Sequence, residues 1–193
     1  MLSQTLYKYR GLSNFRNFAD IILNKRLYAA KYNDLNDPLE GHFIYDSNLL
    51  SSHVINKLAR DKGLIRICSL SKKNDVELMW SHYAEGQSGV AIGLKFNIDK
   101  YKQKEIEYTD IKQIDSSEIN SLSAYDLLSK KLKVWRYEEE VRVFCQKGNF
   151  INNIKIEEIV IGRKVNRLDL SLIKKIIASE GNSIKLIDAS EIL

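Results

Sequence analysis

The stretch that decides the fold is Trp135-Arg136-Tyr137-Glu138-Glu139-Glu140-Val141-Arg142-Val143-Phe144. Its alternating valines and aromatic residues predict a strand over Tyr137–Cys145. Because successive side chains of a strand point to opposite faces, Glu138, Glu140 and Arg142 are expected to share one face. Two carboxylates beside a guanidinium can stabilise a developing cation or activate a hydroxyl, since each charge changes the proton affinity of its neighbours. A solvent-facing strand with a cross-strand ion pair is the alternative interpretation.

The second polar segment is Arg66-Ile67-Cys68-Ser69-Leu70-Ser71, which overlaps the strand predicted over Ile65–Leu70. It ends in two hydroxyls, Ser69 and Ser71, on one face. Serines at the end of a strand can orient a carboxylate or a ligand ribose. They also cap helices and turns routinely. The segment is therefore a candidate binding element with an ordinary structural alternative.

The helix expected after this strand carries apolar residues at helical spacing, namely Val76, Met79, Trp80, Tyr83 and Ala84. Trp80 and Tyr83 lie on the apolar face, which favours core packing, although either ring could stack on a ligand base. His82 points away from that face, where a histidine is commonly a surface or hydrogen-bonding residue, and it is kept as a further candidate ligand-binding residue.

The N-terminal strand predicted over Leu6–Arg10 places Lys8 and Arg10 on one face and Tyr7 and Tyr9 on the other. An arginine at a strand end can bind a pyrophosphate through the bidentate fork of its guanidinium. Tyr9 is a further aromatic side chain that could stack on a ligand base.

The remaining pattern alternates helices with strands. Helices are expected from Asn14, which could cap the first of them, from Asn48 to Lys62 with Gly63 as the stop, over about Ser116 to Lys133, and over Leu168–Ser179. Further strands are expected over Arg26–Ala30, Val90–Phe96, Glu158–Ile161 and Ile184–Ile187. This order predicts one α+β domain over residues 1–193, with a split, largely antiparallel sheet and flanking helices.

Composition fits an ordinary globular protein, with 44% hydrophobic and 28% charged residues among 193. Cys68 and Cys145 each lie in an apolar run, which predicts buried free thiols and a reducing compartment. The chain has no long apolar run, so we expect a cytoplasmic protein without a membrane partner. A net charge of +5 permits a polyanionic partner, and Arg163, Lys164 and Arg167 are the expected phosphate contacts.

Six ordered motifs resemble an uncharacterised bacterial family, a domain of unknown function, over nearly the whole chain. The motifs are Leu6-Tyr7-Lys8-Tyr9-Arg10, Asn36-Asp37-Pro38-Leu39-Glu40, Ser69-Leu70-Ser71, Trp80-Ser81-His82-Tyr83-Ala84, Trp135-x-Tyr137-Glu138-x-Glu140-x-Arg142 and Ile159-Val160-Ile161-Gly162. This resemblance does not by itself imply an activity.

Three of these segments also resemble, in their order, the ADP-ribosyltransferase superfamily: the first strand with Arg10, the strand with Ser69 and Ser71 that precedes a helix, and the late segment with Glu138-x-Glu140. That resemblance implies an ADP-ribosyltransferase-like fold and NAD as co-substrate, without a metal. It implies that Arg10 holds NAD, that Ser69 or Ser71 orients Glu140, and that Glu140 bonds the nicotinamide ribose while Glu138 serves the acceptor. The acceptor is expected to be a nucleic acid or a protein, as for a bacterial toxin or phage-defence effector, with an antitoxin or regulatory protein as a further possible partner.

Two other classes of function stay open. A non-catalytic nucleotide or nucleic-acid binding module on the same fold would use Glu138 and Arg142 only as an ion pair. A metal-dependent nuclease would use Asp37, Glu138 and Glu140, but the strand lacks the lysine usually placed beside such carboxylates. The segment that holds Asp37 is equally explained as a turn in which Asn and Asp bond their own backbone.

Overall fold

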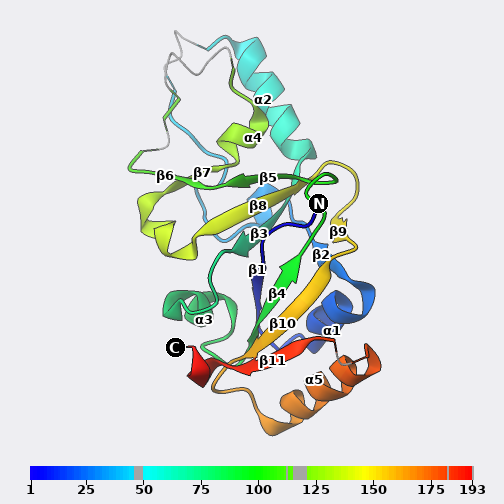
Figure 1. The fold of residues 1–193 in the computed structure, drawn as a ribbon. Coiled ribbons are helices and arrows are strands. Elements are labelled where there is room, and N and C mark those ends of the chain that lie inside the picture. The colour runs from blue at the N-terminus through cyan, green and yellow to red at the C-terminus, as the bar shows by residue number, and fades with distance from the viewer. Residues whose placement is uncertain (46–49, 112, 115–120, 182, 193) are drawn as a thin grey trace.

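The fold is built on one large sheet that runs through the molecule (Figure 1). The computed structural model describes residues 1–45, 50–111, 113–114, 121–181 and 183–192. The strands of the large sheet, in spatial order, are β11 (Lys185–Asp188), β10 (Lys155–Ile161), β4 (Val90–Lys95), β1 (Leu6–Arg10), β3 (Arg66–Ser71), β8 (Glu140–Cys145) and β5 (Lys102–Glu105). Only the β10–β11 pair in this sheet is parallel. The predicted large, mainly antiparallel sheet is confirmed.

The two halves of this sheet meet at a narrow junction. β1 pairs with β4 along its whole length, and β3 does the same with β8, whereas β1 and β3 share the single residue pair Tyr7↔Ser71. Figure 1 shows β3, β8 and β5 running at a marked angle to β1, β4 and β10. The strands β1 and β3 therefore part immediately beyond Tyr7.

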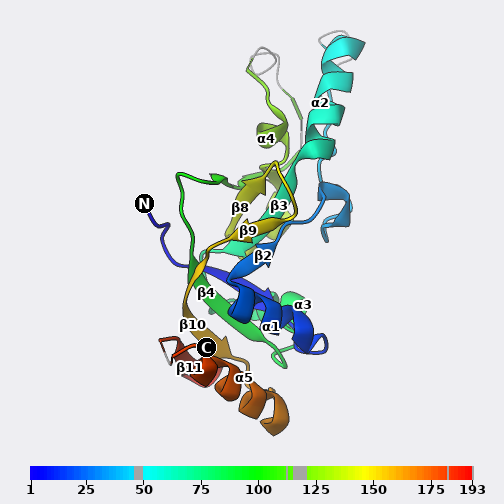
Figure 2. The ribbon, with the colours of Figure 1, turned by 90° about the vertical axis from the view of Figure 1, so that its right-hand side faces the viewer.

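Helices cover both faces of the half made of β1, β4 and β10 (Figures 1 and 2). α1 (Phe15–Asn24) and α5 (Arg167–Ser179) pack on one face, where Phe18, Ile22 and Ile173 are fully buried with the strand residues. α3 (Glu77–Tyr83) packs on the other face through Trp80, which is completely buried. Burying these faces is the main stabilising contribution in this half.

The other half carries smaller elements around its end (Figure 2). They are α2 (Ser52–Leu64), α4 (Ala124–Leu127) and a small sheet of β6 (Glu107–Thr109) with β7 (Lys130–Leu132). A second small sheet, β2 (Arg26–Tyr28) with β9 (Phe150–Asn152), lies in the middle of the molecule, where β2 adjoins α1 (Figure 2). Short 3₁₀ helices complete the described chain, η1 (Tyr32–Asp34), η2 (Lys133–Glu138) and η3 (Ala189–Glu191). β7 supplies Lys131, whose ammonium reaches Glu140 at the start of β8.

The deciding stretch departs from the predicted strand in its first half. Lys133–Glu138 forms a 3₁₀ helix, and Glu139 ends it in the left-handed conformation with φ 41°. β8 therefore begins at Glu140, not at Tyr137. In the first half of the stretch, apolar and polar residues alternate over too few positions to specify a strand. Glu139, in the left-handed conformation, then turns the chain into β8.

Three other expectations are corrected. The helix expected over Ser116 to Lys133 is a single turn, α4, followed by β7, and 115–120 lie outside the described residues. Gly63 does not stop α2, which runs one residue further to Leu64. Asn14 precedes α1 without making a side-chain capping hydrogen bond. The part of the expected second helix at 48–49 lies outside the described residues.

Candidate functional site

A cavity of about 270 Å³ opens where β1 and β3 part. Arg10 of β1, Ser69 of β3 and Glu140 of β8 all line it, so the structure brings together the three residues that the sequence assigns to one cleft. Its volume is at the lower end of the range for small-molecule sites, which suits part of a dinucleotide rather than the whole of one.

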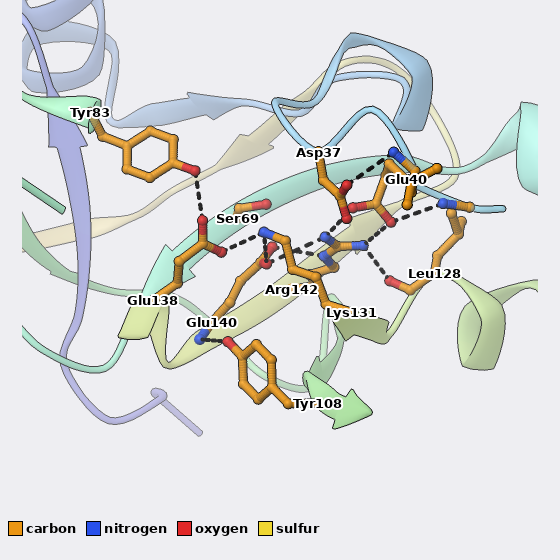
Figure 3. A network of polar contacts seen from close by, with 12 residues as sticks. Asp37, Glu40, Ser69, Tyr83, Tyr108, Leu128, Lys131, Glu138, Glu140 and Arg142 are labelled. Atoms are coloured by element: carbon orange, nitrogen blue, oxygen red, sulfur yellow. Dashed lines mark hydrogen bonds and ion pairs between the residues drawn. The ribbon is translucent and has the colours of Figure 1, made fainter. Parts of the chain in front are cut away.

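Glu140 is a buried carboxylate whose oxygens are engaged by cations. Arg142 Nε donates to its Oε1 at 2.7 Å, and Lys131 Nζ donates to its Oε2 at 3.1 Å (Figure 3). Burial alone would raise the pKa of Glu140, but the charges of Arg142 and Lys131 outweigh it, and the pKa lies well below its usual value. Glu140 is therefore ionised throughout the physiological range.

Glu138 lies beside it although it belongs to η2 and not to the strand. Tyr83 Oη donates to Glu138 Oε1 at 2.6 Å, and Lys131 Nζ donates to Oε2 at 2.5 Å. Burial raises the pKa of Glu138, Lys131 opposes this rise, and the negative charge of Glu140 adds to it. The two carboxylates thus have pKa values displaced in opposite directions, which is typical of an acid–base pair.

Lys131 is the functional residue that the sequence analysis missed. It comes from β7, is 5% exposed, and places its ammonium between Glu138 and Glu140 (Figure 3). β7, which belongs to a separate two-stranded sheet, therefore supplies the lysine that β8 lacks. In the sequence Lys131 stands in the run Lys130-Lys131-Leu132-Lys133, which offers no signal to separate it from surface lysines.

Arg142 joins the site to the Asn36–Glu40 turn. Its Nη1 and Nη2 donate to the two oxygens of Glu40 at 2.7 and 2.6 Å, and Nη1 also donates to the Leu128 carbonyl at 2.7 Å. Arg142 and Glu40 are both almost completely buried. Glu40 thus lies 102 positions from Arg142 in the sequence. The bidentate pair with Arg142 explains how the Glu40 carboxylate can be buried.

The described residues bury more acids than bases. Their buried charged side chains are Asp37, Glu40, Glu138, Glu140, Lys62, Lys131 and Arg142. Four acids and three bases leave one negative charge in excess when all are ionised.

The β1 wall of the cavity is cationic. Lys8 Nζ donates to the Ser69 carbonyl oxygen at 3.0 Å. Arg10 has no ion pair or side-chain hydrogen bond within the described part of the chain, and its Nε is buried. A guanidinium that lines a cavity without a partner is suited to bind an anionic group.

Both serines line the cavity. The Ser71 hydroxyl accepts a hydrogen bond from the backbone N–H of Lys73 at 3.1 Å and so stabilises the turn after β3. Which of the two hydroxyls orients Glu140 stays a prediction.

Of the aromatic candidates, only Tyr83 contacts an acidic residue of the site. Trp80 is fully buried, donates to the Asn74 carbonyl and packs edge-on against Tyr9, whose Oη donates to the Lys73 carbonyl. Their rings belong to the core under α3; Trp80 does not line the cavity, whereas Tyr9 does, so stacking of Tyr9 on a ligand stays a prediction. His82 is exposed and does not line the cavity.

Residues 79–143, from α3 through the first half of β8, match the model of a family described as "Protein of unknown function (DUF2971)". This match supports the resemblance to an uncharacterised domain family. It spans Tyr83, Lys131, Glu138, Glu140 and Arg142, the acidic wall of the cavity. No curated protein and no solved structure matches the chain.

Two further findings concern the described residues as a whole. None of their helices is long and apolar enough to cross a membrane. They contain no group of three or more histidine, cysteine or acidic side chains arranged to hold a metal ion. Cys68 and Cys145 are free and buried, as predicted.

Proposed function

We propose that the protein is an NAD-dependent ADP-ribosyltransferase with an ADP-ribosyltransferase-like fold. The observation that carries this proposal is that the cavity has an unpaired guanidinium, Arg10, on one wall and two buried carboxylates, Glu138 and Glu140, on the other. NAD has the complementary pattern, since its pyrophosphate is anionic and its nicotinamide ring is cationic. A binding module for nucleotides would not require the separated pKa values of the two glutamates.

The chemistry follows from this arrangement. The bond between C1 of the ribose and the nitrogen of nicotinamide breaks, and its electron pair neutralises the pyridinium ring. The ribosyl group then carries cationic character, which nearby carboxylates stabilise as in glycoside hydrolysis. A hydroxyl or amine of the acceptor attacks C1, a new C–O or C–N bond forms, and the proton released by the acceptor passes to Glu138.

The two glutamates have distinct roles in this proposal. Glu140 is held ionised, and Arg142 and Lys131 already occupy its oxygens, so it acts mainly through its charge. Glu138 has fewer donors and a raised pKa, which suits a group that accepts a proton during the reaction. Ser69 and Arg142 position Glu140, and Arg10 binds the pyrophosphate.

The nuclease alternative is less compatible with these contacts. A divalent metal needs carboxylate oxygens as ligands, and here Lys131 and Arg142 occupy those of Glu140 while Lys131 and Tyr83 bond those of Glu138. A metal would have to displace buried charge-assisted hydrogen bonds.

The test is to incubate the purified protein with NAD carrying labelled ADP-ribose, with candidate acceptors, and with or without divalent metal. Nicotinamide release and label transfer without metal are expected. Glu140→Gln should lower both by about a hundredfold or more, corresponding to about 3 kcal/mol of lost electrostatic stabilisation. Glu138→Gln should lower transfer more than hydrolysis, because water can attack the cation without a positioned acceptor.

Glu139→Gln is the matched control. Glu139 points away from Glu138 and Glu140 and pairs with Lys73 at the surface, so its variant should retain activity near that of the wild type. Metal-dependent cutting of nucleic acid would support the nuclease instead. Binding of NAD without cleavage would support the binding module.

A further inference from the structure

A row of aromatic side chains lies just outside the acidic wall of the cavity. Trp135 and Tyr137 of η2 have ring centroids 6.1 Å apart with planes 39° from parallel, and Tyr137 stacks with His82 of α3 at 6.2 Å and 29°. His82 is exposed, and the other two rings are half-buried. We call Trp135, Tyr137 and His82 the aromatic ladder.

The ladder is fixed to the same two elements that hold the site. Glu138 follows Tyr137 directly, and Tyr83, which bonds Glu138, follows His82. Lys131, which bridges the two glutamates, also places its ammonium 4.8 Å from the centroid of the Trp135 ring. Whatever binds on the ladder is therefore held within one or two side chains of Glu138.

The electrostatics around the ladder favour an anionic partner. Arg136 stands between Trp135 and Tyr137 in the sequence. It is exposed, and its guanidinium makes no ion pair within the part of the chain described. The chain as a whole carries a net charge of +5. Planar rings in a row beside an unpaired guanidinium are typical of surfaces that bind single-stranded nucleic acid, because every base can stack on a ring while its phosphate contacts a cation.

We propose that the aromatic ladder is the acceptor site of the protein and that it binds single-stranded nucleic acid by base stacking. This inference rests on the proposed function, since it names the acceptor for Glu138. A duplex is not expected to bind there, because its bases are already stacked on one another. Of the residues expected to contact phosphate, Arg163 pairs with Glu77 at 2.5 Å and bonds Gln87, so Arg136 is better placed for this contact.

The experiment measures binding without NAD, by fluorescence anisotropy, of the full chain to labelled single-stranded RNA and DNA 12-mers, a duplex, and an abasic strand of the same length. The base-bearing strands should bind at least about tenfold more tightly than the abasic strand, which has the phosphates but no bases. Whether RNA or DNA binds more tightly identifies the nucleic acid. Equal binding of base-bearing and abasic strands would overturn the inference.

Variants locate the site. Tyr137→Leu and His82→Ala should each weaken binding of the base-bearing strand by about fivefold or more, while Tyr137→Phe, which keeps the ring, should bind as the wild type does. Tyr45→Leu is the control, because Tyr45 is another exposed ring, paired with Phe43 rather than with the ladder. Thermal melting checks that each variant is folded.

A second readout separates this inference from the proposed function. This readout is NAD hydrolysis by the wild type without acceptor, followed by label transfer to nucleic acid and to protein. If the wild type hydrolyses no NAD, the proposed function fails even where the ladder binds nucleic acid. If it hydrolyses NAD but transfers label to protein and not to nucleic acid, the ladder assignment fails alone.

Discussion

The two walls of the cavity treat charge in opposite ways. On the β8 wall, Glu138, Glu140, Lys131 and Arg142 are buried and bonded to one another. On the β1 wall, Arg10 has no partner within the described residues. One wall is therefore complete without a ligand, and the other becomes complete only when an anion binds.

This difference separates folding from binding. Buried ion pairs are costly to desolvate, and removing one partner leaves an uncompensated charge, so the β8 wall is tied to the stability of the fold. A cation whose buried Nε has no partner does not stabilise the fold, and an anionic ligand would supply the missing partner. Variants of the two walls should accordingly change different measurements.

The largest effect is expected for Arg142→Met, which leaves Glu40 and Glu140 buried without their shared cation. The free energy of unfolding should fall by about 3–5 kcal/mol, as for other buried pairs that lose one partner. Urea unfolding followed by circular dichroism measures this loss.

Lys133→Met provides the comparison at the surface. Lys133 pairs with Asp110 at 2.5 Å, but both side chains are exposed, so the cost should stay below about 1 kcal/mol. If Arg142→Met costs no more than Lys133→Met, the β8 wall is not the part of the cavity on which stability depends.

The next effect is expected for Arg10→Met. Loss of charge-assisted hydrogen bonds to a pyrophosphate, worth about 1.5–3 kcal/mol, should weaken binding of ADP-ribose about 10- to 100-fold in calorimetry. The free energy of unfolding should not fall, because the guanidinium has no partner to lose and its buried, unbonded Nε costs free energy in the wild type.

Arg16→Met is the control for this variant, since Arg16 is exposed on α1 and does not line the cavity. Its binding of ADP-ribose should equal that of the wild type. Unchanged affinity in Arg10→Met would show that the open cation serves no anionic ligand of this kind.

The same contrast decides what could be predicted from the sequence. β1 and its neighbours were predicted closely because Leu6, Tyr7, Tyr9 and Arg10 alternate over a full strand, and α1 and α3 have clear helical spacing. Local periodicity is enough where a strand or helix buries one face against an apolar core.

The β8 wall was predicted only in part. Glu138, Glu140 and Arg142 were placed together correctly, but through a strand alternation that does not exist at Glu138, which reaches the site from a 3₁₀ helix and a left-handed residue. Lys131 and Glu40 were not foreseen as their partners, because charges that meet only through tertiary structure leave no local pattern.

The smallest effect is expected in the pH dependence of transfer, and it tests how Lys131 connects the charges of the β8 wall. Glu138 must be ionised to accept the proton of the acceptor, so the transfer rate should fall as pH falls through the pKa of Glu138, which lies above the usual value of 4.5. Lys131 opposes that rise, and Lys131→Met should therefore move the acid limb of the pH–rate profile to higher pH. At pH well above this limb, Lys131→Met should retain more of the wild-type rate than it does within the limb, because Arg142 keeps Glu140 ionised. Lys133→Met should leave the profile in place, and Glu138→Gln should remove the limb. An acid limb that persists in Glu138→Gln would belong to another group, and Glu138 would not be the proton acceptor.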